Sequence, residues 1–456
     1  MRNSIQFKVS NMTSHDAGEF TLYINNHYNE ANVNEFVMFA EELLESSLND
    51  EVQQFSTAHR FEIALSAWQN FNRRAANVNY VEFKTAKHGT ARDSLSSLQI
   101  ISDDKPFIVD SITELLVAHG CKITTCLHPL ISTVVSQSGK LSAGVDQASF
   151  TSVIYIELST QLDAQLCATL RLKILALLND VAAVTNDWPL MMKQARNINN
   201  AHKNQDLANE INEFLQWLCL GNFTFLGYCS TNVTISSATD TEKLGLFSIL
   251  TTDTSLQNSQ LQLIEQETHA FISAESPLLI SKSRSKSNIH RRDYYDQISV
   301  KEYANNGDVM RVHKFIGLFT QAANQLNPAQ IPYLKFKLDI ALQHSTLKPN
   351  GHMYKKFKHI LEALPKREIF ESNAENLFAL AKGIFTLNAQ SKCGTFIREN
   401  KFNQQVSVLV FVSKDAFSTD LRDELEALLC NAFNGQILSR RSMLNDNYLA
   451  QWHFTL

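Results

Sequence analysis

The side chains best suited to bind a small ligand lie in one short segment of the chain, between Asp103 and Ser111. Aspartate followed by proline is typical of a helix start, where unpaired backbone N–H groups can hold a carboxylate or a phosphate. A helix start that is capped by an aspartate and binds nothing accounts for the same residue types at least as well. We treat the segment as a candidate effector site made of Asp103, Asp104, Pro106, Phe107, Asp110 and Ser111.

Cysteine and histidine gather at a second place and raise the question of a metal site. Cys126 and His128 would share one face of a strand, but Cys121 would not lie on that face. No second cysteine pair stands at zinc spacing. We therefore predict no metal site, with the cysteines packed in a sheet and His128 in a turn before Pro129.

The most basic stretch of the chain offers phosphate or RNA binding as a third possibility. Cations at alternate positions also describe an exposed edge strand that resists pairing with other chains. Asp293 and Asp296 follow at once and partly neutralise the charge, so we favour the edge strand. The basic residues are Lys282, Arg284, Lys286, His290, Arg291 and Arg292.

Common catalytic and cofactor motifs are missing from the sequence. The 14 glycines contain no Gly-x-Gly pair, so no dinucleotide-binding turn is present. Gly139 and Gly144 have the spacing of a phosphate loop, but Val145 and Asp146 follow where lysine and serine or threonine should stand. His-Glu-x-x-His and Gly-x-Ser-x-Gly are also absent. The sequence predicts no catalytic residue and no cofactor-binding residue in this chain.

Composition narrows the class of protein further. With 44% hydrophobic and 19% charged residues, the chain is ordinary globular protein and not a disordered one. A net charge of -5 gives no general attraction to nucleic acid or to an anionic membrane. No apolar run is long enough to span a bilayer, and the N-terminus has no secretory apolar region. The 7 scattered cysteines indicate reduced thiols and a cytoplasmic setting.

The elements that must position these residues predict an α+β chain of several domains. Strand, helix, strand, strand, helix, strand is the expected order around the candidate effector site, as in ligand-sensing ACT-type domains. Its last strand is expected at Val181–Val184, and a short strand at Phe20–Ile24. The predicted domains are an N-terminal helical segment (1–78), an ACT-type domain (79–190), an antiparallel α+β domain (205–323), a helical motif (326–392) and an incomplete second ACT-type domain (393–456).

The last predicted domain reads as a ferredoxin-like βαββαβ unit without its second helix and fourth strand. We therefore expect a truncated unit, with part of one sheet face left bare and a chain that continues in a longer protein. The side chains expected to be exposed are among Ala450, Trp452, Phe454 and Leu456.

Several segments resemble the large bacterial NAD-dependent glutamate dehydrogenases in the same order along the chain. Any one match would be weak, but their order over roughly residues 35–456 is specific. The matching segments are Asp103–Ser111, Leu127–Pro129, Trp217 with Gly221–Tyr228, Pro277–Ser283, Ile289–Arg291, Phe315–Thr320, Ile331–Pro332 and Val406–Val412.

The resemblance implies a layout of ACT-type domain, PAS-like domain, helical motif and second ACT-type domain. It implies that glutamate oxidation with NAD occurs in a catalytic region that this chain lacks, that the intact enzyme is a homo-oligomer, and that an amino-acid effector is a possible ligand. The chain departs from the family at three places. Arg311-Val312 stands where the family has acidic residues, Leu364–Phe370 stands where it has Tyr-Pro-Arg-Asp-Glu-Leu-Phe, and Gln404-Gln405 stands where it has Arg-Phe. Because of these departures, the resemblance does not imply that the family's regulatory contacts are kept in this chain.

The reading that follows is a regulatory and assembly region of such an enzyme, inactive by itself, with no nucleic-acid or membrane partner. A free-standing amino-acid-sensing regulator of the same ancestry is the alternative, and RNA binding through the basic stretch is a third reading. RNA-binding aromatic motifs are missing, which weighs against the third.

Overall fold

The computed structural model describes residues 14–45, 55–85, 95–135, 141–143, 149–198, 202–233, 238–249, 268–304, 306–390, 392–400, 405–444 and 449–456. The chain forms two compact units. The first is Met1–Thr185 together with the loop Ser287–Arg292, and the second is Asn186–Lys286 with Asp293–Leu456.

The first unit is built on a six-stranded antiparallel sheet with the strand order β1-β2-β6-β4-β5, in which β3 also pairs with β6. Consecutive residues of the central strands β2 and β6 are buried, so both faces of these strands are covered. The strands are β1 (Tyr80–Lys84), β2 (Ser96–Asp103), β3 (Ile123–Leu127), β4 (Leu130–Val135), β5 (Leu141–Ala143) and β6 (Ser149–Leu158).

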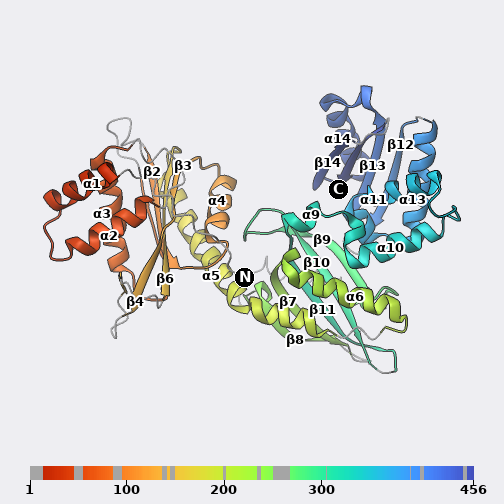
Figure 1. Ribbon diagram of the computed structural model, residues 1–456, viewed down its shortest axis with the longest axis horizontal. Helices are drawn as coiled ribbons and strands as arrows, with labels where there is room; N and C mark the ends of the chain where they lie inside the picture. Colours follow the sequence, from red (N-terminus) through yellow and green to blue (C-terminus); the bar gives the residue numbers. More distant parts are fainter. Residues whose placement is uncertain are drawn as a thin grey trace. The chain divides into compact units, whose positions relative to one another are not determined.

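Helices cover both faces of this sheet (Figure 1). The helices α1 (Ser14–His27), α2 (Val33–Glu45) and α3 (Thr57–Arg73) form a core with one face, and α4 (Ile108–Ala118) and α5 (Ala164–Asn197) lie on the other. In α3, Ser56 caps the helix by accepting a hydrogen bond from the His59 N–H at 3.3 Å. Its apolar stripe at helical spacing is buried, at Ile63, Ala64, Ala67, Trp68 and Phe71.

The second unit contains a five-stranded antiparallel sheet in the order β8-β7-β11-β10-β9. The helix α6 (Gln205–Trp217) precedes it, capped by Asn204, whose side chain accepts from the Leu207 N–H at 3.1 Å. The strands and short elements are β7 (Phe223–Val233), β8 (Ala238–Gly245), α7 (Leu246–Ile249), β9 (Leu278–Lys286), β10 (Tyr294–Tyr303) and β11 (Val309–Phe319). This is the antiparallel α+β domain that the sequence predicts; its PAS-like character stays a prediction.

A group of helices and a four-stranded antiparallel sheet complete the second unit. The sheet order is β12-β13-β15-β14. The helices are α9 (Gln321–Gln325), α10 (Pro332–Gln343), α11 (His352–Glu362), α12 (Lys366–Glu371) and α13 (Ala374–Gln390). The sheet elements are β12 (Gly394–Asn400), β13 (Gln405–Ser413), α14 (Thr419–Phe433), β14 (Ser439–Leu444) and β15 (Leu449–Thr455).

The two ACT-type sheets share one arrangement. In each, the strand before the first helix lies between the third strand of the unit and an extra strand from its N-terminal side: β2 between β6 and β1, and β13 between β15 and β12. Both extra strands are antiparallel to their neighbour and occupy the position that the fourth strand takes in a ferredoxin-like sheet. The α+β fold class with ferredoxin-like units is therefore confirmed, and the position of the fourth strand is filled by a preceding segment.

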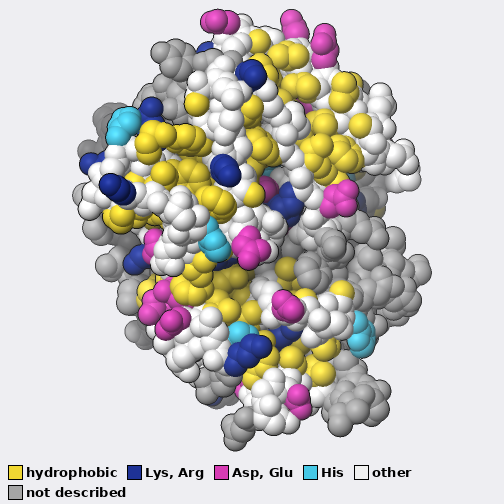
Figure 2. All heavy atoms as spheres, turned by 90° about the vertical axis from the view of Figure 1, so that its right-hand side faces the viewer, with side chains coloured by type: hydrophobic (Ala, Val, Ile, Leu, Met, Phe, Trp, Pro, Cys, Tyr) yellow, Lys and Arg dark blue, Asp and Glu magenta, His cyan; other side chains and the backbone are white. Residues whose placement is uncertain are grey.

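The expectation of a bare apolar sheet face in the last unit is wrong for the residues it named. Ala450, Trp452, Phe454 and Leu456 are at most 8% exposed, because α14 covers them and the ring of Phe417 stacks on Trp452 with 4.4 Å between centroids. Apolar side chains do reach the surface of this unit at Ile397, Leu428 and Leu444. Figure 2 shows how widely apolar atoms spread over one face of the molecule.

Two short strand predictions are also wrong. Phe20–Ile24 lies in the helix α1, and Val181–Val184 lies in the middle of α5. Both segments are apolar and short, and periodicity over so few residues does not separate a strand from a buried helix. The flanking residues distinguish the two structures. Val181 and Val184 continue the buried face of α5 that begins with Leu170, Ile174 and Leu177.

Candidate functional site

The start of α4 is the segment that the sequence predicts as an effector site, and its geometry differs from a capped helix. The helix begins at Ile108, and its N-cap residue is Phe107, which makes no side-chain capping hydrogen bond. The predicted aspartate cap is wrong because both aspartates remain tied to the sheet. Asp103 ends β2 and accepts a hydrogen bond from Arg74 at 2.5 Å, and the N–H of Asp104 donates to the Phe150 carbonyl at 3.2 Å.

Ser111 joins this helix start to the loop 287–292, which belongs to the same compact unit. Its hydroxyl accepts a hydrogen bond from the backbone N–H of His290 at 2.8 Å and donates to the Phe107 carbonyl at 2.6 Å. Ser111 is 1% exposed. One residue earlier, a carboxylate oxygen of Asp110 lies 3.0 Å from Nδ1 of His290. The two segments, 180 residues apart in the chain, therefore meet through the buried hydroxyl of Ser111 and the hydrogen bond between Asp110 and His290.

Both partners at this contact have an unusual backbone. Phe107 has a φ of 73° and His290 a φ of 69°, in the left-handed region that side chains other than glycine rarely adopt. Such residues cost about 1–3 kcal/mol and persist where the surrounding contacts fix them. Their rings lie 5.1 Å apart between centroids. The contact between Phe107, Ser111 and His290 is thus the feature that holds both strained residues in place.

The structure brings together only part of the predicted set. Phe107, Asp110 and Ser111 meet the loop 287–292, whereas Asp103 faces Arg74 and Pro106 is exposed before the helix. Burial lowers the pKa of His128, and the negative charge of Asp104 opposes that shift. Binding of an effector by these residues stays a prediction.

The cysteine and histidine group shows packing roles. His128 Nε2 lies 2.7 Å from the Ser152 hydroxyl, and burial raises the pKa of the Cys121 and Cys126 thiols. Within the residues that the structure describes, no group of three or more His, Cys, Asp or Glu side chains could hold a metal ion.

The basic stretch begins on an edge strand, as expected. β9 is the last strand of its sheet, and Lys282 pairs with Asp296 at 3.0 Å and with Asp293 at 3.4 Å. Lys286 lies over the ring of Tyr294, 4.9 Å from its centroid. Lys282 and Lys286 are thus both used in contacts within the domain itself.

Sequence reasoning missed a buried ionic cluster between α12 and the last sheet. Glu368 and Glu371 of α12 both accept hydrogen bonds from Arg398 of β12, at 2.9 Å for Glu368 and 2.8 Å for Glu371. Arg367 pairs with Glu371 at 2.9 Å, and His453 Nε2 lies 3.4 Å from Glu368. In the sequence, this cluster is indicated only by the motif Leu364–Phe370, which departs from the pattern of the family.

The described part of the chain is a multi-domain α+β structure that contains two ACT-type sheets. Family models match it in three places, in this order: glutamate dehydrogenase ACT1 domain at 39–174, glutamate dehydrogenase helical motif 1 at 331–390, and glutamate dehydrogenase ACT2 domain at 395–456. Together these matches cover more than half of the chain. The chain belongs to the family of large bacterial NAD-dependent glutamate dehydrogenases.

Curated relatives agree with this assignment. NAD-specific glutamate dehydrogenase from Halomonas elongata is 27% identical over 415 residues, which is 86% of this chain and 26% of that protein. The Pseudomonas aeruginosa protein of the same name is 25% identical over 94% of this chain and 28% of its own length. The Mycobacterium tuberculosis protein is 24% identical over 78% of this chain and 22% of its own length. The chain thus spans about a quarter of the length of these relatives.

Among solved structures, one titled "Structure of an RNA-binding Light-Oxygen-Voltage Receptor" aligns with 72% of this chain and 94% of its own, at 10% identity. Its TM-score of 0.15 carries no argument about the fold. No helix in the described part of the chain is both long and apolar enough to cross a membrane.

Proposed function

We propose that this chain is the regulatory and assembly portion of a large NAD-dependent glutamate dehydrogenase. The intact enzyme would convert L-glutamate, NAD⁺ and water to 2-oxoglutarate, ammonium and NADH. The observation that carries the proposal is the ordered match to an ACT1 domain, a helical motif and an ACT2 domain of that enzyme family, over about a quarter of the relatives' length.

The geometry of the first unit supports a regulatory role over a catalytic one. The contact of Ser111 with His290 links two segments that are distant in the chain and holds two strained residues, Phe107 and His290. A contact of this kind is suited to have two states, which an amino-acid effector would shift by binding one state more tightly. Homo-oligomer formation and a cytoplasmic location belong to the same proposal.

The experiment is a segment exchange in the Pseudomonas aeruginosa relative, which aligns with 94% of this chain. Its matching segment is replaced by this chain, and NADH formation from glutamate is followed with and without added amino acids. The proposal expects an active chimera whose activity responds to at least one amino acid differently from the parent enzyme. A chimera with full activity and the parent's unchanged response would overturn the regulatory role. A soluble but inactive chimera that fails to assemble would overturn the proposed assembly role.

A further inference from the structure

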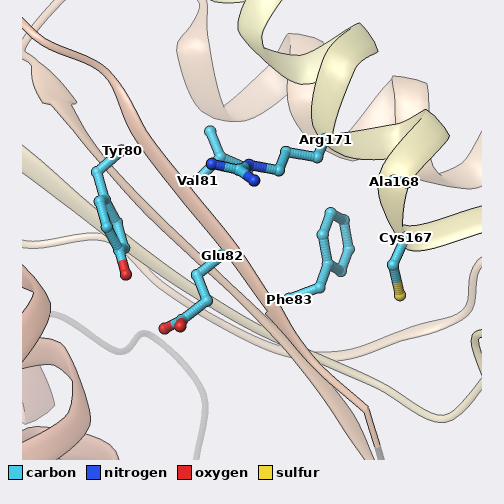
Figure 3. A pocket seen from close by; sticks show the side chains of 7 residues that line it. All are labelled: Tyr80, Val81, Glu82, Phe83, Cys167, Ala168 and Arg171. Carbon is cyan, nitrogen blue, oxygen red and sulfur yellow. The ribbon is translucent and has the colours of Figure 1, made fainter. Parts of the chain in front are cut away.

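An open cavity of about 300 Å³ lies in the first unit, between the edge strand β1 and the helix α5 (Figure 3). One wall is the strand from Tyr80 to Phe83. The other wall is one side of the helix, with Cys167, Ala168 and Arg171. A volume of this size is at the small end of the range for ligand sites, so any ligand would be a small molecule.

The strand gives the cavity an apolar wall because its side chains alternate between faces. Val81 and Phe83 are directed toward α5, whereas Tyr80 and Glu82 are directed to the opposite side (Figure 3). Both outward residues are occupied on that opposite side: Tyr80 donates to Asn70 at 3.0 Å, and Glu82 accepts from Asn70 at 2.7 Å. The carboxylate of Glu82, which also lines the cavity, is therefore held by Asn70.

The helix supplies one cation. The side chain of Arg171 extends across the top of the cavity toward Val81 (Figure 3). Among the residues that the structure describes, Arg171 has no hydrogen bond or ion pair, in contrast to Arg74, Arg367 and Arg398. A guanidinium beside apolar side chains matches a carboxylate attached to an apolar group, since its planar N–H fork fits both carboxylate oxygens.

The position of β1 adds backbone hydrogen-bonding capacity. β1 is the terminal strand of its sheet and, among the described strands, pairs only with β2. In an antiparallel edge strand, alternate residues direct their N–H and C=O groups away from the partner strand. Such groups belong to the strand that forms one wall of the cavity.

We propose that the cavity between β1 and α5 binds a small monocarboxylate with a short branched or aromatic apolar group. The carboxylate pairs with Arg171, and the apolar group packs against Val81, Phe83 and Ala168. A dicarboxylate is disfavoured because Arg171 is the one cation among the lining residues, and Glu82, which also lines the cavity, would repel a second carboxylate. The site is distinct from the start of α4, and its ligand binding is independent of the proposed enzyme assignment.

The test is calorimetric titration of the full chain with benzoate and with 4-methyl-2-oxopentanoate, and with benzyl alcohol and succinate as chemical controls. The two monocarboxylates should bind and the two controls should not. Replacing Arg171→Gln should weaken binding by about tenfold to a hundredfold, the value of a charged hydrogen-bonded contact. Lys193→Gln removes an equal charge from an exposed position of the same helix and should leave binding unchanged.

A second readout uses the cysteine in the cavity wall. Bound benzoate should slow alkylation of Cys167 by iodoacetamide, measured by peptide mass spectrometry, while the exposed Cys393 reacts at an unchanged rate. Failure of both monocarboxylates to bind the folded chain would overturn the proposal, as would equal binding by Arg171→Gln or equal binding of benzyl alcohol. None of these results depends on glutamate oxidation, so they separate the cavity from the proposed function.

Discussion

Glu368 on α12 and Arg398 on β12 form a bidentate ion pair. Nε of Arg398 lies 2.9 Å from Oε2 of Glu368, and Nη2 lies 3.0 Å from Oε1. The Glu368 side chain is 2% exposed. Arg398 also reaches Glu371 at 2.8 Å, so one guanidinium bridges two carboxylates of the same short helix. The pair therefore attaches the helical motif to the first strand of the last sheet.

Removal of Arg398 should destabilise the second unit strongly. Arg398→Met leaves Glu368 buried without its cation, and breaking a buried pair in this way costs about 3–5 kcal/mol. Arg398→Met combined with Glu368→Leu should cost less than the sum of the two single changes, because neither charge is then left alone. Urea unfolding of the four proteins, which are the native chain, the two single variants and the double variant, measures this coupling.

The exposed pair Arg440 with Glu426, at 3.1 Å, is the control, and Arg440→Met should cost less than about 1 kcal/mol. Equal costs for Arg398→Met and Arg440→Met would show that the buried pair contributes no more than a surface pair.

Glu368 should also control stability in acid. Burial by itself would raise its pKa, but hydrogen bonds from His453, Arg398 and Ser407 and the charge of Arg398 hold the pKa of this carboxyl well below its usual range. A lowered carboxyl pKa gives stability that is present above the unfolded value near 4.5 and is lost as the pH falls below it. The urea midpoint of the native chain should therefore fall more steeply below pH 4.5 than that of Glu368→Gln. Glu424→Gln, at an exposed position of α14, should follow the native curve; parallel acid limbs for all three proteins would contradict the role of Glu368.

Lys337 of α10 should lower the stability of the folded chain near neutral pH. Burial and the charge of Arg398 lower its pKa to about 7, while Glu371 opposes the shift. Between pH 7 and its ordinary value of 10.5 the unfolded chain holds a proton that the folded chain has lost, so stability rises with pH across this window. Lys337→Met should be more stable than the native chain at pH 6, and its advantage should disappear by pH 10. The lost hydrogen bond to the Phe370 carbonyl, at 2.9 Å, reduces the gain at every pH. Lys355→Met on the exposed side of α11 is the control, and a pH-independent difference for Lys337→Met would contradict the prediction.

The sequence predicts local features of this chain well and long-range pairing poorly. The apolar stripes of α3 and α14 and the alternation in β15 are local periodicities, and the structure has all three elements. The role of β12 beside β13 depends on pairing between strands, which no local pattern reports. The prediction of an aspartate cap is wrong for a related reason, because Asp103 accepts a hydrogen bond from Arg74, 29 residues earlier in the chain. The contact of Ser111 with His290, across 179 residues, is equally invisible, although both segments stood out as motifs.

Ser111→Ala should loosen the loop 287–292. The change removes the acceptor of the His290 N–H and the donor to Phe107, and a lost buried hydrogen bond of this kind costs about 1–3 kcal/mol. Because His290 is held at a φ of 69°, the loop should then relax and trypsin should cut sooner after Arg291 and Arg292. Limited proteolysis with mass spectrometry measures the rates at these two sites. Thr113→Ala, which removes only hydrogen bonds to backbone carbonyls within α4, is the matched control. Equal cleavage rates in both variants would show that Ser111 does not hold the loop.

Hydrogen exchange in the last sheet should follow strand position, with slow exchange in β13 and β15 and fast exchange in β12 and β14. The central strands pair on both sides, and their apolar residues from Val408 to Phe454 form one core with α14. The edge strands pair on one side only, and β14 is exposed along most of its length. Local opening costs least free energy where few buried contacts must break, so protection should fall outward from the centre of the sheet.

Phe454→Ala should abolish the difference between central and edge strands, because it opens a cavity beneath α14 that costs about 3–5 kcal/mol. Leu444→Ala, at a side chain that is 66% exposed, should leave the difference intact. Uniformly fast exchange from 405 to 456 in the native chain would show that α14 alone does not stabilise the sheet, and would restore the expectation of an incomplete unit.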